Sequence, residues 1–373
     1  SGVWIMAYTT IDDPTAYFQT KLYTGNSAAD DANLTTSQAL TFDGNSDMQP
    51  DLLWFKRRDG ADHHLWFDNI RGRTKGLYSN LSQAEDNLAN SITSFDSDGF
   101  TLGNDTGTGG TINKSNETYV AWGWKAGTSF TNDASSTSVG SIDSTGSVNT
   151  DAGFSIISWS GTGSNGTIAH GLGSAPKVVL LKERDGANNW LMYHETLNAS
   201  LGDYSRFMTF NSNGAVAGAN NVVFQNSVFT SSVFNVGTSA GSNGNGGAYI
   251  AYCFAEKQGY SKFGIYTGNG NADGTFIYTG FKPAWFIMKN TASGNNWHIM
   301  DHKRDPDNVV EQLLKVNAND AENTTNGKMD FLSNGVKIKS TSTGANASGA
   351  TYIYMAFAEN PFVTSTGVPA TAR

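Results

Sequence analysis

The stretch Tyr119-Val120-Ala121-Trp122-Gly123-Trp124 decides the fold, because the chain repeats it twice. It returns as Tyr249-Ile250-Ala251-Tyr252-Cys253-Phe254 and again as Tyr352-Ile353-Tyr354-Met355-Ala356-Phe357. Nearly every position of the three runs is apolar, which is typical of a strand that is covered on both faces. We therefore expect three buried strands. The positions that we expect to lie largely inside are Trp122, Ala251, Cys253 and Phe357.

Other landmarks recur around these strands, always in the same order. An asparagine lies six residues before each strand, and further upstream a lysine closes each of three apolar runs. The period is a little over one hundred residues, which indicates a repeated whole domain and not a solenoid unit. The asparagines are Asn113, Asn243 and Asn346; the lysines are Lys56, Lys182 and Lys289; the earliest landmarks are Tyr23-Thr24-Gly25, Trp159-Ser160-Gly161 and Tyr266-Thr267-Gly268.

The repeat divides the chain into modules. Residues 128–152 are almost purely Ser, Thr, Asn, Asp and Gly, and we interpret them as a linker or an extended, weakly paired arm. Met6 fits a native start, which would make residues 1–5 an addition. The predicted divisions are an N-terminal segment at 1–17, modules at 18–127, 153–260 and 261–373, the linker, and a short C-terminal tail within the last module.

The local patterns predict an all-β fold of three tandem antiparallel β-sandwich or jelly-roll-like modules. Short runs rich in Val, Ile, Tyr, Phe and Trp alternate with Gly, Asn, Asp and Ser clusters. Asp98-Gly99 and Asn334-Gly335 suit two-residue hairpin turns, because glycine tolerates positive φ. Helix signals are scarce, and the best of them, at 83–88 and 308–313, predict one or two turns at most.

Composition limits the function. Charged residues are 15% of the 373, the formal net charge is −9, and no basic stripe occurs, which argues against nucleic acid as a partner. No apolar stretch reaches transmembrane length, so we expect no membrane insertion, and the N-terminus lacks a signal-peptide pattern. The lone Cys253 excludes a disulfide within the chain and is expected to be a buried thiol.

No motif predicts catalysis, and we expect no cofactor and no metal. The sequence has no GxSxG, HExxH or P-loop, although two carboxylates from distant strands could still converge as in a glycosidase. Asp96-Ser97-Asp98-Gly99 resembles part of a calcium loop but lacks the further ligands, so a hairpin turn is favoured. The six histidines form no HxH pair and no cysteine accompanies them, so a zinc site is not expected, and we interpret them as local solvated positions.

Two sets of matched residues are the candidate ligand-binding sites. Asp68 and Arg71 in the first module correspond to Asp301 and Arg304 in the third, at the same distance from the landmark lysine. An internal Asp–Arg pair that braces a corner is the competing interpretation. Tryptophans can stack on sugar rings, but large aromatics more often fill a core. The candidate residues are Trp66, Asp68, Arg71, Trp297, Asp301 and Arg304; Trp4, Trp54 and Tyr204, present in one copy only, remain open for glycan stacking.

Several motifs resemble a repeat of structural proteins from marine tailed phages, cyanophages and pelagiphages especially. They are Phe263-Gly264-x-Tyr266-Thr267-Gly268-Asn269-Gly270, Tyr278-Thr279-Gly280-Phe281-x-Pro283-Ala284-Trp285, Asp330-Phe331-Leu332-Ser333-Asn334-Gly335 and Asn346-Ala347-Ser348-Gly349-x-Thr351-Tyr352 through Phe362. Residues 95–100, 119–127 and 170–176 are similar to other modules of the same family. The resemblance spans nearly the whole chain. It implies a tail fibre or another virion structural protein on the tail or capsid exterior, with no catalytic residues to carry over.

These observations lead to a set of functional expectations. We expect a tail fibre or tail component that touches host-surface glycans, among other virion proteins. The alternative is a capsid decoration or accessory protein without an adhesive role, and a polysaccharide-degrading tailspike is third. A homo-oligomer is expected, a trimer by analogy to phage fibres. The linker at 128–151 is the segment that we expect to cross to a neighbouring chain.

Overall fold

The fold is all-β, as predicted. The computed structural model describes residues 7–27, 37–105, 111–292, 294–325 and 327–371. Strands hold 40% of the residues and helices 5%. Neither expected helix forms: residues 83–88 include strand β6, and 308–313 have no helical turn. The helices are η1 (Pro14–Ala16), α1 (Ala134–Thr137), α2 (Glu195–Leu201) and α3 (Ala240–Asn243).

Three large antiparallel sheets share one strand order, with the repeated apolar strand second in the common set of five. The first sheet is β1 (Phe18–Thr24), β9 (Thr118–Trp124), β3 (Leu52–Arg57), β4 (Leu65–Asp68), β5 (Lys75–Tyr78) and β6 (Asp86–Asn87). The second contains β12 (Phe154–Ser160), β18 (Ala248–Phe254), β14 (Val178–Glu183), β15 (Leu191–His194) and β16 (Met208–Thr209). The third is β19 (Ser261–Thr267), β26 (Thr351–Pro361), β21 (Phe281–Asn290), β22 (His298–Asp301) and β23 (Leu314–Lys315).

Each large sheet packs one face on a small sheet, which gives a two-layer sandwich with its own core. The small sheets are β2 (Gln38–Leu40), β8 (Gly99–Leu102) and β7 (Ile92–Asp96); β13 (Gly166–Ala169) and β17 (Val233–Val236); and β20 (Phe276–Tyr278), β25 (Gly335–Ile338) and β24 (Met329–Leu332). We call each large sheet with its small sheet the first, second or third module.

The predicted hairpins form, one residue earlier than expected. Asp96 pairs with Gly99, and Leu332 pairs with Gly335. The two turn residues are therefore Ser97-Asp98 and Ser333-Asn334, and glycine opens the second strand. Gly99 has φ of +103°, so the positive φ falls just after the turn.

The opposite faces of the three large sheets meet in one shared core. Alternate residues along β3 show the division: Leu52 and Trp54 enter the shared core, whereas Leu53 and Phe55 enter the local sandwich. Both faces of the repeated apolar strands are therefore covered, as predicted. The four positions expected inside, Trp122, Ala251, Cys253 and Phe357, are at most 1% exposed.

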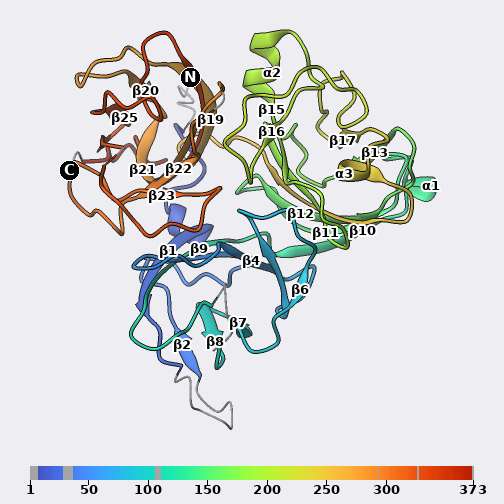
Figure 1. Ribbon diagram of the computed structural model, residues 1–373, viewed down its shortest axis with the longest axis horizontal. Helices are drawn as coiled ribbons and strands as arrows, with labels where there is room; N and C mark the ends of the chain where they lie inside the picture. Colours follow the sequence, from blue (N-terminus) through green and yellow to red (C-terminus); the bar gives the residue numbers. More distant parts are fainter. Residues whose placement is uncertain (1–6, 28–36, 106–110, 293, 326, 372–373) are drawn as a thin grey trace, which may run out of the picture.

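The three modules form a ring around this shared core (Figure 1). The residue two positions after each landmark lysine accepts a backbone hydrogen bond from the next module around the ring. The bonds run from Glu85 N to Arg184 O at 2.6 Å, from Glu322 N to Arg58 O at 2.7 Å, and from Val216 N to Thr291 O at 2.9 Å. The second module thus contacts the first, the first contacts the third, and the third contacts the second, which is a pseudo-threefold arrangement within one chain.

The segment predicted as a linker is part of the second sheet. It forms β10 (Thr128–Asn132) and β11 (Ser144–Asn149), which extend that sheet in the order β10-β11-β12. Backbone pairing along all of β11 supplies the order that the few apolar side chains do not, and Phe130 and Val148 pack against the local core. The segment pairs with its own chain, so the structure gives no support to the predicted crossing to a neighbour.

The recurring asparagines clamp the start of each module. The side-chain oxygen of each one accepts a hydrogen bond from a backbone N–H just after the first large-sheet strand. The distances are 3.0 Å for Asn113 to Asn26, 3.2 Å for Asn243 to Thr162, and 2.9 Å for Asn346 to Asn269. The tyrosine that begins each repeated strand accepts a backbone hydrogen bond from the same loop, from the N–H of Lys114, Gly244 or Ala347.

A glycine lies directly before each backbone N–H that bonds to a recurring asparagine, and its lack of a side chain leaves room for this loop. A Cβ at Gly161 would lie 2.1 Å from the carbonyl oxygen of Gly244, and the equivalent approach at Gly25 and Gly268 is 2.3 Å. We expect Gly161→Ala to lower the free energy of unfolding by about 1–3 kcal/mol, because the backbone must move to accommodate the methyl group. Urea denaturation measures the change.

Gly218→Ala is the matched control for that substitution. Gly218 is exposed, and a Cβ added there would have no neighbouring atom within 4 Å. The control is expected to change stability by less than about 0.5 kcal/mol. Equal effects of the two substitutions would show that the close approach at Gly161 is unimportant.

The recurring lysines tie the hairpin that follows each apolar run. Their side chains lie inside the protein, and burial lowers the pKa of each to about 8. Each Nζ donates to the carbonyl oxygen of the next residue and to a second carbonyl in the turn. The second acceptors are Gly60 for Lys56 at 3.0 Å, Gly186 for Lys182 at 2.9 Å and Ala292 for Lys289 at 3.2 Å.

The described part of the N-terminal segment bonds to the second and third modules. Asp13 and Thr15 bond to the loop at 43–46 of the first module, whereas the first described residues bond to later parts of the chain. The Tyr8 hydroxyl donates to Gly280 O at 2.7 Å, and the Thr9 hydroxyl donates to Gln258 O at 2.7 Å. The segment therefore links the start of the chain to its third module and to the end of the second.

Candidate functional site

Most of the predicted site residues meet at the junctions between modules. The decisive position lies twelve residues after each landmark lysine, at the end of β4, β15 or β22, where the chain has Asp68, His194 or Asp301. Each of these side chains is at most 1% exposed. A carboxylate at such a position requires partners, because an unpaired buried charge is strongly unfavourable.

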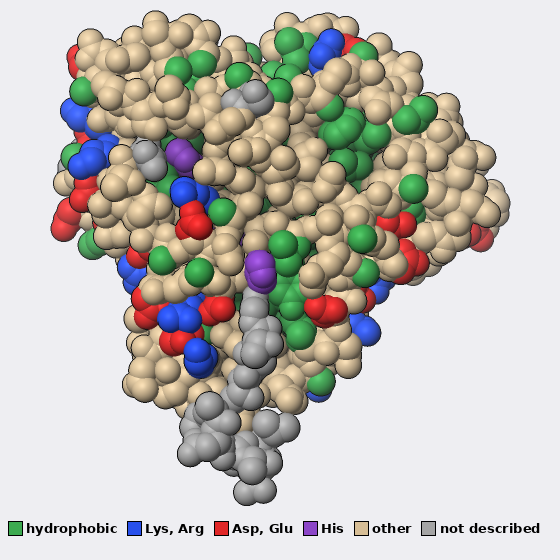
Figure 2. Space-filling view, in the orientation of Figure 1, with side chains coloured by type: hydrophobic (Ala, Val, Ile, Leu, Met, Phe, Trp, Pro, Cys, Tyr) green, Lys and Arg blue, Asp and Glu red, His purple; other side chains and the backbone are tan. Residues whose placement is uncertain are grey.

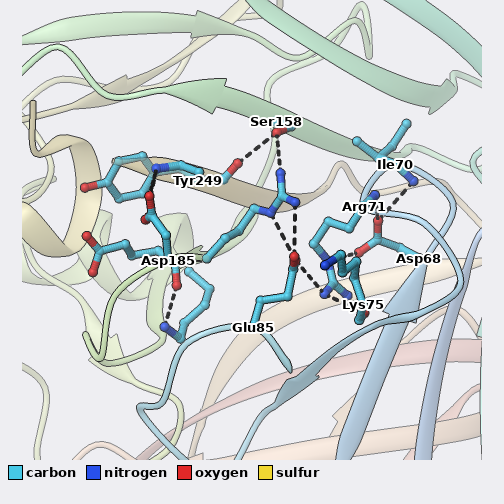
Figure 3. A network of polar contacts seen from close by, with 12 residues as sticks. Asp68, Ile70, Arg71, Lys75, Glu85, Ser158, Asp185 and Tyr249 are labelled. Atoms are coloured by element: carbon cyan, nitrogen blue, oxygen red, sulfur yellow. Dashed lines mark hydrogen bonds and ion pairs between the residues drawn. The ribbon is translucent and has the colours of Figure 1, made fainter. Parts of the chain in front are cut away.

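The first network joins the first and second modules (Figure 3). Arg71 Nε donates to Asp68 Oδ2 at 2.5 Å, and the backbone N–H groups of Ile70 and Arg71 donate to Asp68 Oδ1. From the second module, the Tyr252 hydroxyl donates to Asp68 Oδ2 at 2.7 Å. These four donors satisfy a carboxylate that has no contact with solvent.

Glu85 extends the first network across the junction. Its carboxylate accepts from Arg71 Nη1 at 3.2 Å and from Arg184 of the second module at 3.1 and 3.2 Å (Figure 3). Burial by itself disfavours a charged guanidinium, but the nearby Asp68, with Tyr252 and Glu85, raises the pKa of Arg71. Arg71 is therefore held as a cation between two carboxylates.

The second network repeats this arrangement between the first and third modules. Arg304 Nε donates to Asp301 Oδ2 at 2.6 Å, and Trp122 of the first module donates to the same oxygen at 3.0 Å. Glu322 accepts from Arg304 Nη1 at 2.9 Å and from Arg58 Nε at 3.0 Å. Burial alone would raise the pKa of Asp301, but Arg304 holds it below its ordinary value.

The third junction lacks every member of the network at once. His194 replaces the aspartate, Leu197 replaces the arginine, and Met355 stands where the other modules supply Trp122 or Tyr252. Val216 makes the backbone contact that the glutamates make elsewhere. The charged groups therefore occur as a complete set or not at all, which is what the cost of an unpaired buried charge predicts.

The structure places all six predicted ligand-binding residues inside the molecule. None of them is more than 7% exposed, and the side chains of both arginines are 0% exposed. Asp68, Asp301 and Trp297 bond to other modules, and each arginine bonds to carboxylates of its own module. The internal-pair and core interpretations therefore describe their positions, and the ligand-binding prediction has no support from them. The residues are Trp66, Asp68, Arg71, Trp297, Asp301 and Arg304. Trp54 is also buried, and Trp4 lies outside the described residues.

The residues eight positions after each lysine hold the same junctions. Trp190 Nε1 donates to Tyr78 O at 2.9 Å, and Trp297 Nε1 donates to Ser212 O at 3.2 Å. In the first module this position is His64, whose Nδ1 accepts from Trp54 Nε1. The proton therefore sits on Nε2, which donates to Lys315 O at 3.1 Å. The ring of His64 thus replaces an indole.

The prediction that the histidines are solvated is wrong for four of the six. His64, His170, His194 and His298 are at most 4% exposed. Each of the four is packed inside the protein, and the neighbouring residues in the sequence do not distinguish such a position from a surface one. Burial lowers the pKa of His64 well below its ordinary value, and lowers that of the other three to about 4.

We expect the protein to lose stability on acidification between pH 6.5 and about pH 4. In this window the unfolded chain, with histidine pKa values near 6.5, binds protons that the folded chain does not bind. The free energy of unfolding should fall by up to about 1.4 kcal/mol per pH unit for each buried histidine. Urea denaturation at a series of pH values measures the slope. His298→Gln should reduce this slope by up to about 1.4 kcal/mol per pH unit, the contribution of one proton. A free energy of unfolding that does not change with pH in this window would contradict this account.

One open cavity lies at the junction of the first and third modules. It has a volume of about 220 Å³ and is lined by residues of β1, of the loop at 43–45, and of the third module around β21, β22 and β26. Its lining includes Phe18, Thr20, Asp43, His302, Lys303 and Asn360. None of these residues is among the ligand-binding candidates of the sequence analysis.

Two further properties of the described residues bear on function. No three His, Cys, Asp or Glu side chains gather there in a way that could hold a metal ion, and the Asp96-Asp98 segment is a hairpin turn. None of the helices in that part of the chain has the length or apolar character to cross a membrane. Figure 2 shows charged side chains scattered over one face, among a larger area of other side chains and backbone.

Comparison with known proteins gives a family without a function. Residues 13–361 match the model of DUF7483, a domain of unknown function, and the chain belongs to that family. The match covers all three modules as one unit, in agreement with the shared core. No curated protein matches the sequence.

Proposed function

We propose that this chain is a structural protein of a tailed-phage particle, a tail fibre or tail component on the particle exterior that contributes to attachment to host-surface glycans. The observation that carries the proposal is the use of the repeated residues. The asparagines and lysines that recur in each module hold loops and turns, and the buried ion pairs hold modules together. Repetition therefore serves a rigid architecture.

The setting in a phage particle rests on the resemblance of the sequence motifs to marine phage structural proteins. The low content of charged residues, which are scattered over the face drawn in Figure 2, suits an exterior part of a particle. Attachment through such parts depends on many weak sites at fixed spacing. A rigid ring with a single common core keeps that spacing.

The proposal includes other virion proteins as neighbours and a homo-oligomer as the working form, a trimer by analogy. The pseudo-threefold ring bears on this point, because one chain already presents three similar modules around an axis. A single copy could therefore occupy a threefold position that three copies of a simpler subunit would otherwise fill.

A specific observation favours the second candidate, a capsid decoration or accessory protein without an adhesive role. The six residues that the sequence offered as ligand contacts are buried at module junctions. Adhesion therefore requires a site of another kind, and without one the chain would contribute only shape and stability to the particle.

The proposal is tested on purified phage particles whose genome encodes this chain. Quantitative mass spectrometry should find the chain at a fixed copy number per particle, and cryo-electron microscopy should locate the three-lobed ring on the exterior. Absence from washed particles would contradict the proposal. Competition separates the two candidates: the free protein should reduce adsorption of the phage to its host if the role is adhesive, and should leave it unchanged if the role is purely structural.

A further inference from the structure

The cavity at the junction of the first and third modules is a place where the pseudo-threefold symmetry breaks. Thr20 in β1 pairs with Trp122, just as Ile156 in β12 pairs with Tyr252. The equivalent residue of the third module is Phe263, which pairs with Met355. Two of the three positions are thus apolar and belong to the shared core, whereas the first module has a hydroxyl there.

The opposite wall breaks the symmetry in the same way. Lys303 lies two residues after Asp301, where the first module has Ile70 and the second has Thr196. Ile70 packs against the shared core, and the Thr196 hydroxyl lies 3.4 Å from Phe263 O. At the junction with the cavity, by contrast, Thr20 and Lys303 both line open space. The two substitutions that open the cavity therefore come from different modules.

The Thr20 hydroxyl is evidence that the cavity holds a ligand. Thr20 is 2% exposed, and Oγ1 has no hydrogen-bond partner among the described residues. A buried hydroxyl without a partner costs about 1–3 kcal/mol, so its retention in place of an aliphatic side chain calls for a compensating contact. A hydroxyl group of a molecule in the cavity would supply it.

One wall of the cavity is held rigid before any ligand binds. Gln19 Nε2 donates to Thr15 O at 2.9 Å and to Ser46 O at 2.8 Å, while its Oε1 accepts from Gly44 N at 2.8 Å. The Thr15 hydroxyl oxygen also accepts from Asn45 N at 3.0 Å. A preformed wall lowers the entropic cost of binding.

The charges at the cavity are already paired. Asp43 lies 2.7 Å from Lys303 and 3.8 Å from Lys21, and Glu359 lies 3.2 Å from Lys282. The lining therefore offers no single uncompensated charge, which disfavours a strongly ionic ligand. Phe18, Ala284 and Ala358 supply apolar surface, while the side chains of Asn45, His302 and Asn360 are polar.

We propose that this cavity binds one neutral sugar residue, with the Thr20 hydroxyl bonded to a sugar hydroxyl. A sugar ring has an apolar C–H face and polar edges, which match the two kinds of surface in the cavity. The volume of about 220 Å³ is below the ~300–1,000 Å³ typical of drug-sized ligands, so it suits a single ring. The inference deepens the attachment role proposed above by giving it a site.

Binding is tested on the purified full chain with four neutral monosaccharides: glucose, galactose, mannose and N-acetylglucosamine. Saturation-transfer NMR and titration calorimetry should detect at least one of them, with a Kd of about 1 mM or weaker, as expected of one member of a multivalent surface. Sodium sulfate is the ionic comparator and should not bind. Binding of none of the sugars up to about 50 mM, or of sulfate alone, would overturn the proposal.

Two variants connect the binding to this cavity. Thr20→Val keeps the shape and removes the hydroxyl, so it should weaken binding about tenfold. Thr20→Ile combined with Lys303→Ile reproduces the residues of the junction between the first and second modules and should abolish binding. Thr24→Val, on the exposed end of the same strand, is the control that should bind as the wild type does. Unchanged binding in the double variant would overturn the assignment.

The outcome is independent of where the chain resides. A chain that binds sugar but is absent from phage particles would refute the virion setting and leave the site intact. A chain that is present in particles but binds no neutral sugar would refute the site and leave a structural role.

Discussion

Replacing Arg71 with methionine is expected to lower the free energy of unfolding by about 3–5 kcal/mol, the usual cost of removing one partner of a buried ion pair. Asp68 would keep its contact with Tyr252 but would lose its only cationic partner among the described residues, in a position with no solvent access. Urea denaturation followed by tryptophan fluorescence measures the loss.

Two comparisons separate the buried charge from general disruption. The double variant Asp68→Asn with Arg71→Met should lose less stability than Arg71→Met alone, because it removes the stranded charge. Lys328→Met removes an ion pair with Glu311 in which both side chains are at least 37% exposed, and should cost less than about 1 kcal/mol. If Arg71→Met alone lost no more stability than the double variant, the role given to Asp68 would be contradicted.

Phe357→Ala is the second substitution with a large expected effect, a loss of about 3–5 kcal/mol. Phe357 is 1% exposed, and its ring lies 5.3 Å from that of Phe18 in the first module and 5.9 Å from that of Phe254 in the second. It also contacts Trp285 of its own module at 5.7 Å. One truncation would therefore open the shared core where all three modules meet.

The control for Phe357 is Phe276→Ala. Phe276 lies on the edge strand β20 and is 43% exposed, so its truncation is expected to cost less than about 1 kcal/mol. Thermal unfolding of both variants under the same conditions gives the comparison. A loss below about 1 kcal/mol for Phe357→Ala would place this strand outside the core.

The sequence predicted the strands well because their signals are local. Apolar alternation, hairpin residues and the threefold recurrence of the landmarks were sufficient for an all-β fold with covered central strands. They did not reveal what covers those strands. Leu52 and Leu53 are equally apolar, yet one faces the shared core and the other its own sandwich. Only the arrangement of the three modules decides between the two.

Of the two interpretations of residues 128–151, a linker or an extended, weakly paired arm, the structure contradicts the linker, because the segment forms the paired strands β10 and β11. The segment at 128–151 has few apolar side chains, and its order comes from backbone hydrogen bonds along β11, which composition does not register. Strand pairing of this kind depends on an available edge. The edge is β12, whose own start lies only a few residues further along the chain.

The candidate site was half predictable. Pairing of Asp68 with Arg71 follows from their spacing, but the donors Tyr252 and Trp122 come from other modules, far away in the sequence. A signal was present: the second module lacks both the aspartate and the arginine, and Met355 replaces the donor. That joint loss indicates a contact between modules. The cavity had no such signal, because its residues are defined by differing from their counterparts.

The central claim is that three repeated β-modules fold as one unit around a shared aromatic core. Equilibrium unfolding of the full chain in urea, followed in parallel by tryptophan fluorescence and far-UV circular dichroism, tests it most directly. The tryptophans of the shared core, among them Trp54, Trp122 and Trp285, report on the ring, and the dichroism reports on all the sheets. We predict a single transition with coincident curves. Separate transitions, with the fluorescence change complete before the strand signal is lost, would show that the modules are independent domains.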